Sequence, residues 1–484
     1  MIVPRRKPLT ANIGILGVGH KTYWDQFDGL LDVMESKMTI FADILKDKGV
    51  TVCDLGLVDD SKKAYHALKE IKRHDIDLLF IRMVTYATSE TFAPIVQGLS
   101  IPIVLVALQQ DKAFDYKNGT TFLQLCNDDI CAVPEFCSVA VRMGKPIPNV
   151  IIGYQDNDTV ALKEIDDYCR AAHAIHDLKC ANIGYIGRVL ETMYDMHVDP
   201  ALLTKTFGCH VLPMEAEEIY QNFKHTDPAK TEAMKQRILS FFNTPEPGVD
   251  NLADKVNTSD IIFSAQVAVA LETLIDQRDL TGFAYYYEGE AGSEMRRVMT
   301  NLIVGNSLLT SAGFPMCGEF DLKTCLAMLI MDRLEIGGSF AEFHPIDFHK
   351  GTVLVGHDGP HHINIAQSKP VLRFLKKYHG KPGSGAGVEF NIKEGPITML
   401  AITINKQNEL KFIIAEGVSV GGRIPSTGNT NTHALFQPDL VTFLKRWMAE
   451  GPTHHFALGI GHHAKDIEFI AQSFGVECIT IPKE

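Results

Sequence analysis

The hydrophobic and polar positions of the first 178 residues alternate between short apolar runs and longer amphipathic stretches. The apolar runs occur at residues 13–18, 52–55, 78–84 and 103–108. Between and after them, apolar side chains recur every three or four positions, which predicts helices at 27–45, 64–71, 92–99 and 162–178. Strands that alternate with helices in this way indicate βαβ units, and therefore a parallel sheet with helices on both faces.

A second alternating block follows, with strand-like runs at residues 181–186, 209–213, 261–265 and 283–287 and an apolar helix at 267–275. A further helix is expected after Glu319, where Leu322, Cys325, Leu326 and Leu329 share one helical face. From residue 336 the helical period fades, and short β-type runs recur at 353–355, 363–366, 388–392, 397–404 and 410–415. Turn residues separate these runs, which favours a compact all-β module, either sandwich or barrel. A helix at 438–450 and strands at 456–458 and 477–481 close the chain.

Composition narrows the class of protein. The net charge is 46 − 59 = −13 without a basic stripe, so neither nucleic acid nor an anionic membrane surface is an expected partner. The N-terminus lacks the apolar core of a signal peptide, and no apolar run reaches the length of a membrane span. The ten cysteines form no CxxC pair, which predicts reduced core thiols, no zinc cluster and a cytoplasmic location.

Four residues offer a candidate metal site. Glu319 precedes a predicted helix, Glu342 follows Gly-Gly-Ser-Phe in an expected loop, His357 ends a strand-like run, and His455 adjoins another. Two carboxylates and two imidazoles suit Mn²⁺ or a similar ion with positions left open for a substrate. Taken singly, each such residue is more often a helix cap or a hydrogen-bonded side chain.

The glycines at positions 14, 17 and 19 invite a dinucleotide-binding interpretation, but Thr22 stands where the next glycine is required. A tight turn after the first strand is the better explanation. His20 then lies beyond a strand end, where parallel sheets bind ligands, and is a candidate substrate-binding residue. The polar, glycine-rich residues 288–292 form another rim that a sugar could use.

Four segments, in order, resemble motifs of the L-arabinose isomerase family, within the L-arabinose/L-fucose isomerase group. Residues 318–324 (Gly-Glu-Phe-Asp-Leu-Lys-Thr) are similar to the family's Gly-Glu-Gly-Asp-Trp-Lys-Thr, and 338–342 (Gly-Ser-Phe-Ala-Glu) to Thr-Ser-Phe-x-Glu. Residues 350–357 resemble Lys-Gly…Leu-Gly-Ser-His, and 451–455 (Gly-Pro-Thr-His-His) resemble Gly-Gly-Ala-His-His. By position, His455 rather than His454 matches the metal ligand.

The resemblance implies two Rossmann-like, flavodoxin-type domains at residues 1–178 and 179–335, followed by a β-barrel-type domain at 336–484. It implies a Mn²⁺ site, with Co²⁺ or Mg²⁺ as alternatives, formed by Glu319, Glu342, His357 and His455, and a homohexamer. The two glutamates would transfer protons during aldose–ketose isomerisation through an enediol. Five neighbouring residues could support the site, although a structural role is favoured for each: Asp321, Lys323, His344, His361 and His362.

The sequence departs from the family where the sugar would bind. Asn127 falls on a family asparagine, but Cys131 and Pro134 fall where the family has a sugar-contacting histidine and an arginine, and Leu322 replaces the motif tryptophan. We therefore expect a different, unphosphorylated sugar. Two other functions stay open: a cytoplasmic sugar-binding protein without catalysis, and a metal-dependent epimerase or lyase that acts on a related sugar or sugar acid.

Overall fold

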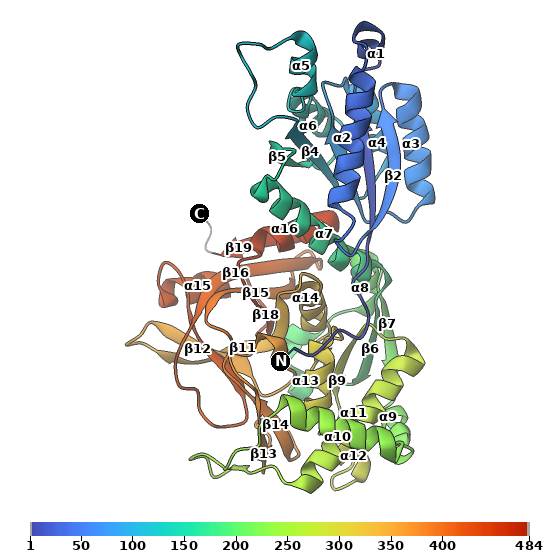
Figure 1. Ribbon diagram of the computed structural model, residues 1–484. Coiled ribbons are helices and arrows are strands. Elements are labelled where there is room, and N and C mark those ends of the chain that lie inside the picture. The colour runs from blue at the N-terminus through green and yellow to red at the C-terminus, as the bar shows by residue number, and fades with distance from the viewer. Residues whose placement is uncertain (1, 482–484) are drawn as a thin grey trace. The chain divides into compact units, whose positions relative to one another are not determined.

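The computed structural model describes residues 2–481 (Figure 1), which form two compact units. The N-terminal unit is Pro8–His176, and the main unit comprises residues 2–7 and 177–481. The predicted division of the main unit at residue 335 stays a prediction. The expected fold class is confirmed, because two parallel sheets with helices are followed by a closed antiparallel barrel.

The N-terminal unit is built on a parallel sheet with strand order β2-β1-β3-β4-β5, the flavodoxin-like order. Its strands are β1 (Asn12–Val18), β2 (Thr51–Val58), β3 (Leu78–Met83), β4 (Ile103–Gln109) and β5 (Asn149–Tyr154). Its helices are α1 (Thr22–Gln26), α2 (Leu30–Ile44), α3 (Ser61–Arg73), α4 (Ala93–Gly98), α5 (Thr121–Cys126), α6 (Val133–Arg142) and α7 (Thr159–Cys180), whose last residues belong to the main unit. Strand β3 is buried along its whole length, which explains why all its residues except Arg82 are apolar.

Close packing accounts for two of the glycines in the first strand–turn segment. A Cβ atom at Gly17 would lie 2.7 Å from Sδ of Met38, and one at Gly19 would lie 2.9 Å from the Trp24 ring. Neither distance is tolerated by real side chains. The turn after β1 therefore needs glycine in order to pack against α1 and α2, whatever binds at its rim.

A buried ion cluster anchors the carboxyl edge of this sheet. Asp129 accepts hydrogen bonds from Lys37 Nζ (2.8 Å) and Arg82 Nη1 (2.6 Å), and all three side chains are at most 2% exposed. Burial, only partly opposed by Asp129, lowers the pKa of Lys37 to about 8. One carboxylate thus pairs with two cations and fixes the loop after α5, which carries Asn127 and Cys131.

Replacing Asp129 with alanine should destabilise the N-terminal unit by about 3–5 kcal/mol, because two buried cations lose their counter-ion. The measurement is urea unfolding of the metal-free protein, followed by circular dichroism. Asp43→Ala is the matched control, since Asp43 pairs with Lys46 on the surface and exposed pairs contribute little. A D129A midpoint equal to that of the control would contradict a central role for this cluster.

The main unit begins with a second parallel sheet, of strand order β10-β9-β6-β7. Its strands are β6 (Asn182–Gly187), β7 (His210–Met214), β9 (Gly282–Tyr286) and β10 (Met316–Cys317). The helices of this part are α8 (Pro200–Phe207), α9 (Ala216–Lys224), α10 (Pro228–Phe241), α11 (Thr258–Arg278), α12 (Glu294–Met299) and α13 (Ile303–Ser311). Figure 1 shows these helices around the green strands of the sheet.

The predicted strand at residues 261–265 is wrong, because these residues lie inside α11. A capping box of Asn257 and Asp260 starts the helix ahead of the apolar run, and short apolar runs alone do not distinguish a strand from a buried helix. By length and composition α11 could cross a membrane, but 56% of its most apolar stretch is buried within the protein. Core helices commonly have this character.

The barrel is closed by antiparallel pairing in the order β15-β18-β11-β12-β17-β16, with β16 pairing back to β15. The strands are β11 (Gly337–Asp347), β12 (Thr352–His357), β15 (Gly395–Ile404), β16 (Leu410–Val420), β17 (Thr430–Leu435) and β18 (Phe456–Ile460), with β19 (Glu477–Ile481) added parallel to β16. A small separate sheet contains β8 (Ala253–Asp254), β13 (Val371–Leu375) and β14 (Gly385–Glu389). Helices α15 (Leu440–Ala449) and α16 (Ala464–Ser473) lie beside the barrel.

Two predictions in this region are wrong. Residues 363–365 form a 3₁₀ helix rather than a strand, because the Ile365 amide donates to the His362 carbonyl and the Ile363 amide donates to Ser311 Oγ. Glu342 lies within strand β11 rather than in a loop. The two glycines ahead of it, Gly337 and Gly338, both have positive φ angles (103° and 106°). Glycine is typical of turns because it adopts such angles, so the sequence indicates a turn although strand β11 has already begun.

Helix α14 (Leu322–Arg333) joins the parallel sheet to the barrel. It contacts β9 and β10 on one side and β11, β15 and β18 on the other, and all its residues are buried. A helix buried on every side needs no polar face. Its N-terminus lies directly after Glu319, so the core of the main unit fixes one edge of the candidate site.

Candidate metal centre

Barrel pairing brings three of the four predicted ligands together. Strand β11 lies between β12 and β18, with Glu342 opposite Gly356 and Ala341 opposite Phe456. His357 follows Gly356, and His455 precedes Phe456. Residues more than a hundred positions apart therefore meet across adjacent strands. Glu319 reaches the same place from the turn between β10 and α14.

The donor atoms of these residues converge. Those of Glu342, His357 and His455 all lie within 4.8 Å of one another. Nε2 of His357 is 3.8 Å from a carboxylate oxygen of Glu319 and 3.8 Å from one of Glu342, while Nε2 of His455 is 3.4 Å from Glu319. The Phe340 ring packs against both imidazoles, with ring centres 4.3 Å apart in each case.

A strained turn holds Glu319. The φ angles of Glu319 and Phe320 are +56° and +67°, a left-handed conformation that costs energy in residues other than glycine. The Phe320 amide donates to the Tyr285 carbonyl (3.1 Å), and its ring packs edge-on against Tyr185. These contacts hold the turn in a shape that directs the Glu319 carboxylate towards the histidines.

Each histidine is oriented by a further carboxylate. Nδ1 of His455 is 3.2 Å from Asp321, and Nδ1 of His357 is 3.0 Å from Asp358. Asp321 is fully buried and also caps α14 by accepting from the Lys323 and Thr324 amides. A carboxylate on Nδ1 fixes the ring and leaves Nε2 to face the cluster, an arrangement common behind metal-bound histidines. From the sequence, Asp321 is predicted to support the site only as one of five possible residues. Asp358 is not predicted, although it directly follows His357.

The electrostatics of the cluster keep Glu319 ionised. Burial opposes ionisation of Glu319, but His455, His357 and Lys381 outweigh it and lower its pKa to about 2. Burial would also depress the pKa of His455, yet Asp321 and Glu319 raise it to about 9. Concentrated negative charge thus holds a proton on a buried imidazole, where a metal ion could supply the positive charge instead.

The residues present fit a divalent ion. Among the described residues, Nε2 of His455 is buried and has no hydrogen-bond partner of acceptable geometry. Two carboxylates and two imidazole nitrogens surround that position, a donor set suited to Mn²⁺ and similar borderline ions. The fit rests on these protein atoms alone, and the ion's identity stays a prediction.

The other residues proposed to support the site differ in their contacts with the cluster. Nε2 of His344 is 3.9 Å from Glu342 and 3.0 Å from the Gly356 carbonyl, so it lies beside the cluster. Lys323 instead bonds to the Asp195 carbonyl (3.0 Å), and His362 pairs with Asp332 (3.4 Å). His361 is buried, and its Nδ1 lies 3.4 Å from Ser339. The contacts of Lys323, His361 and His362 agree with the structural roles that the sequence favours for them.

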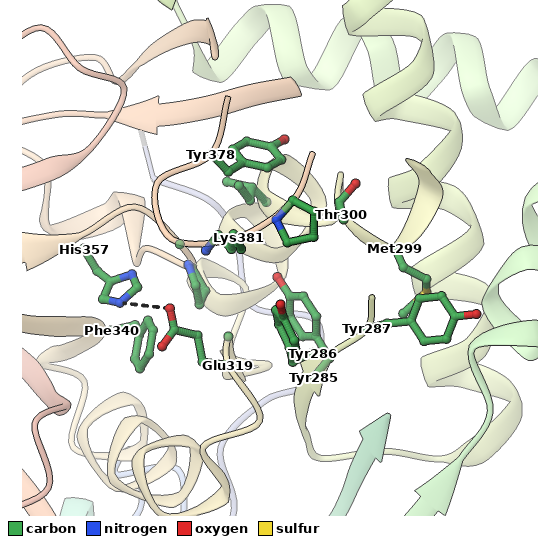
Figure 2. Close-up of a pocket in the computed structure, with 15 residues that line it drawn as sticks. Tyr285, Tyr286, Tyr287, Met299, Thr300, Glu319, Phe340, His357, Tyr378 and Lys381 are labelled. Atoms are coloured by element: carbon green, nitrogen blue, oxygen red, sulfur yellow. Dashed lines mark ion pairs between the residues drawn. The ribbon is translucent and has the colours of Figure 1, made fainter. Parts of the chain in front are cut away.

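A pocket in the main unit opens beside Glu319 and His357 (Figure 2). Its wall includes Lys381 and three consecutive tyrosines, at positions 285–287. Figure 2 shows the polar cluster at one end and Tyr287 with Met299 at the other. This aromatic wall was not predicted from the sequence, although three adjacent tyrosines ahead of the predicted polar rim offered a signal.

The three predicted sugar-binding residues all belong to the N-terminal unit. The His20 ring packs edge-on against Tyr23 at 4.9 Å, and burial raises the pKa of the Cys131 thiol. Asn127 is occupied by local hydrogen bonds, to the Asp111 backbone and side chain (2.8 Å each) and to the Leu123 carbonyl (3.0 Å). Sugar binding by these residues stays a prediction.

None of the cysteines in residues 2–481 forms a disulfide. Five of them are buried, which agrees with the expected core role, whereas Cys131 and Cys180 are exposed. Burial raises the pKa of Cys325, which lies in α14, to about 12. The buried thiols are therefore inert, hydrophobic components of the core.

His361 should make the stability of the metal-free protein depend on pH. Burial lowers its pKa from 6.5 to about 3, so the folded form rejects a proton that the unfolded chain accepts. Stability is therefore present above pH 6.5 and is lost as the pH falls towards 3. Between about pH 6 and pH 5, wild type should lose about 1.4 kcal/mol per pH unit more than His361→Asn.

Urea unfolding at a series of pH values measures this difference in slope. His349→Asn, which changes an exposed histidine, is the control and should follow the wild-type slope. Parallel slopes for wild type and H361N would show that His361 is protonated in the folded protein.

Comparison with known proteins relates this chain to the L-arabinose isomerases. The family model for the L-arabinose isomerase C-terminal domain matches residues 337–477, which include Glu342, His357 and His455. The L-arabinose isomerase of Shigella dysenteriae serotype 1 (strain Sd197) is 22% identical over 360 residues, covering 72% of this chain and 70% of that protein. That of Nocardioides sp. (strain ATCC BAA-499 / JS614) is 20% identical over 407 residues, covering 82% and 79%.

The resemblance found in the motifs is thus confirmed: the chain is similar to L-arabinose isomerases, and residues 337–477 match the C-terminal domain of that family. A solved C2-type ketoreductase from a modular polyketide synthase matches with a TM-score of 0.21 and 11% identity, over 65% of this chain and 82% of that one. A likeness this low carries no argument about fold or function.

Proposed function

We propose that the protein is a divalent-metal-dependent aldose–ketose isomerase that acts on an unphosphorylated sugar. The observation that carries the proposal is the convergence of Glu319, Glu342, His357 and His455 beside a pocket. Similarity to L-arabinose isomerases supports it from an independent direction. Such an enzyme must move a proton between adjacent carbons of an open-chain sugar, through an enediol.

The four cluster residues would hold the ion, for which we expect Mn²⁺, with Co²⁺ or Mg²⁺ as alternatives. The ion, when bound, would polarise the sugar carbonyl and stabilise negative charge on its oxygen. Asp321 and Asp358 would keep the proton of each supporting imidazole on Nδ1, so that Nε2 is available as a ligand.

Glu319 and Glu342 would transfer the protons. One carboxylate takes the proton from the carbon next to the carbonyl, and the other moves a proton between the two oxygens. Glu319 is 10% exposed, whereas Glu342 is 31% exposed, so the two acids meet different environments. Different environments allow two carboxylates to take different acid–base roles.

The sugar itself is expected to differ from L-arabinose. Cys131 and Pro134 stand at positions where the family resemblance places a histidine and an arginine, so the contacts with the far end of the sugar would change. The negative net charge and the absence of a glycine-rich phosphate loop in the sequence favour an unphosphorylated substrate. We also expect a cytoplasmic homo-oligomer, a hexamer by resemblance, without nucleic acid or membrane partners.

Glu319→Gln should retain the fold and abolish turnover, because it removes a proton acceptor while preserving the shape of the side chain. The loss in kcat should be at least about 10²–10⁴-fold. Ketose formation is measured with the Mn²⁺-loaded protein and a panel of aldopentoses, aldohexoses and their deoxy forms.

Glu335→Gln is the matched control, since it makes the same charge change at an exposed position after the end of α14. Bound Mn²⁺ is determined in parallel by equilibrium dialysis, so that loss of metal is separated from loss of proton transfer. An E319Q variant as active as E335Q would end the proposed role of Glu319.

A further inference from the structure

Lys381 is a cation in the wall of the pocket with no role in the proposed metal site. It lies in the loop between β13 and β14 and lines the pocket together with Glu319 and His357. Its side chain is 17% exposed, so it is largely shielded from solvent. In Figure 2 Lys381 lies between His357 and the tyrosine wall, where a bound substrate would pass.

The ammonium group of Lys381 retains donors for a ligand. An ammonium carries three N–H donors, and within residues 2–481 Lys381 makes one hydrogen bond, to Asp358 (3.3 Å). Of the hydroxyl groups in the pocket wall, Tyr285 accepts from Asn306 (3.1 Å) and Tyr378 donates to Asn301 (3.3 Å), whereas Tyr286 has no hydrogen-bond partner among the described residues. None of these hydroxyl groups bonds to Lys381, so its remaining donors are available to a ligand in the pocket.

Asp358 fixes this cation in place. Its carboxylate lies 3.0 Å from Nδ1 of His357 and 3.3 Å from Nζ of Lys381, so one side chain orients both groups. Burying an ammonium is costly unless it is paired, and Asp358 supplies the pairing without using all of the donors. The result is a rigid positive group facing the same space as the proton-transferring carboxylates.

We propose that Lys381 is a substrate-binding residue that donates a hydrogen bond to a sugar oxygen and stabilises the negative charge that develops there. This inference rests on the proposed isomerase function. When a glutamate takes the proton from the carbon, the electron pair of the C–H bond forms the C=C bond of the enediolate. The carbonyl π electrons then move onto oxygen. Lys381 donates to that oxygen without losing its own proton. The negative oxygen then receives the proton of the neighbouring hydroxyl group, and protonation of the carbon that carried the original carbonyl leaves a neutral carbonyl at the adjacent carbon.

The charge balance favours a neutral sugar over a sugar acid as the ligand of Lys381. Asp358 already neutralises the ammonium, and a divalent ion would offset the charges of Glu319 and Glu342. Lys381 therefore has no excess positive charge that would favour a permanent carboxylate over a neutral sugar. A charge that appears only during reaction, on an oxygen close to Lys381, gains from a donor that is already oriented.

The test compares Lys381→Met and Lys381→Arg with wild type, and uses Lys377→Met as a matched control on the same loop, since Lys377 is exposed. For the aldose that turns over best, kcat and KM are measured with Mn²⁺-loaded protein. Removing one preorganised donor typically lowers kcat about 10²–10³-fold. K381M should show such a loss with KM changed less than kcat, K381R should recover part of it, and K377M should match wild type.

Binding supplies a readout that is independent of turnover. Calorimetry compares the hydroxamate of that aldose, an anionic analogue of the enediolate, with the corresponding neutral alditol. K381M should lose affinity for the hydroxamate about 10-fold or more while its alditol and Mn²⁺ affinities stay close to those of wild type. Equal losses for both analogues would reduce Lys381 to a structural role and overturn the proposal, as would unchanged kinetics in K381M.

These measurements also distinguish a failure of the proposed isomerase function from a failure of the proposed role of Lys381. A wild-type protein that isomerises no aldose would contradict the isomerase function, whereas an active wild type with an equally active K381M would contradict only the role of Lys381. Tighter binding of the matching aldonate than of the alditol, abolished in K381M, would show that the ligand of Lys381 is a carboxylate and overturn the charge-balance argument.

Discussion

The structure of the site depends on the N-terminus of one buried helix. Helix α14 has no exposed residue, so its first amide groups need partners from the protein. Asp321 supplies them, and the same carboxylate lies 3.2 Å from Nδ1 of His455. One buried charge therefore serves the helix and the candidate metal centre together. Any shift of α14 in the core would move Glu319, Asp321 and the orientation of His455 at once.

The barrel contributes the second constraint, through strand register. Glu342, His357 and His455 meet because β11 is paired with β12 on one side and β18 on the other. A slip of one residue would turn the side chains of a strand to the opposite face, which would disperse the donor atoms. The buried residues of the barrel thus specify the site indirectly. The high pKa of His455 and the low pKa of Glu319 record how strongly charge is concentrated there.

Much of the fold could be predicted from hydrophobic periodicity, since both parallel sheets and most barrel strands produce clear patterns. The failures have local causes: the run at residues 261–265 is too short for its apolar pattern to distinguish a strand from part of helix α11, and two positive-φ glycines hid the start of β11. The four candidate ligands could be named because their motifs are local. Asp358, Lys381 and the tyrosine wall could not be ranked from sequence, since their importance arises from contacts made only after folding. The sugar-binding roles of His20, Asn127 and Cys131 stay predictions.

The most direct measurement is proton exchange at the carbon next to the carbonyl. Mn²⁺-loaded protein is incubated in D₂O with a panel of unphosphorylated aldoses and ketoses, and deuterium incorporation and ketose formation are followed by NMR. We predict deuterium at C2 together with aldose–ketose interconversion for at least one sugar outside the arabinose configuration. Binding of Mn²⁺ without exchange in any sugar would contradict isomerase catalysis, and deuteration with a different product would identify an epimerase or lyase instead.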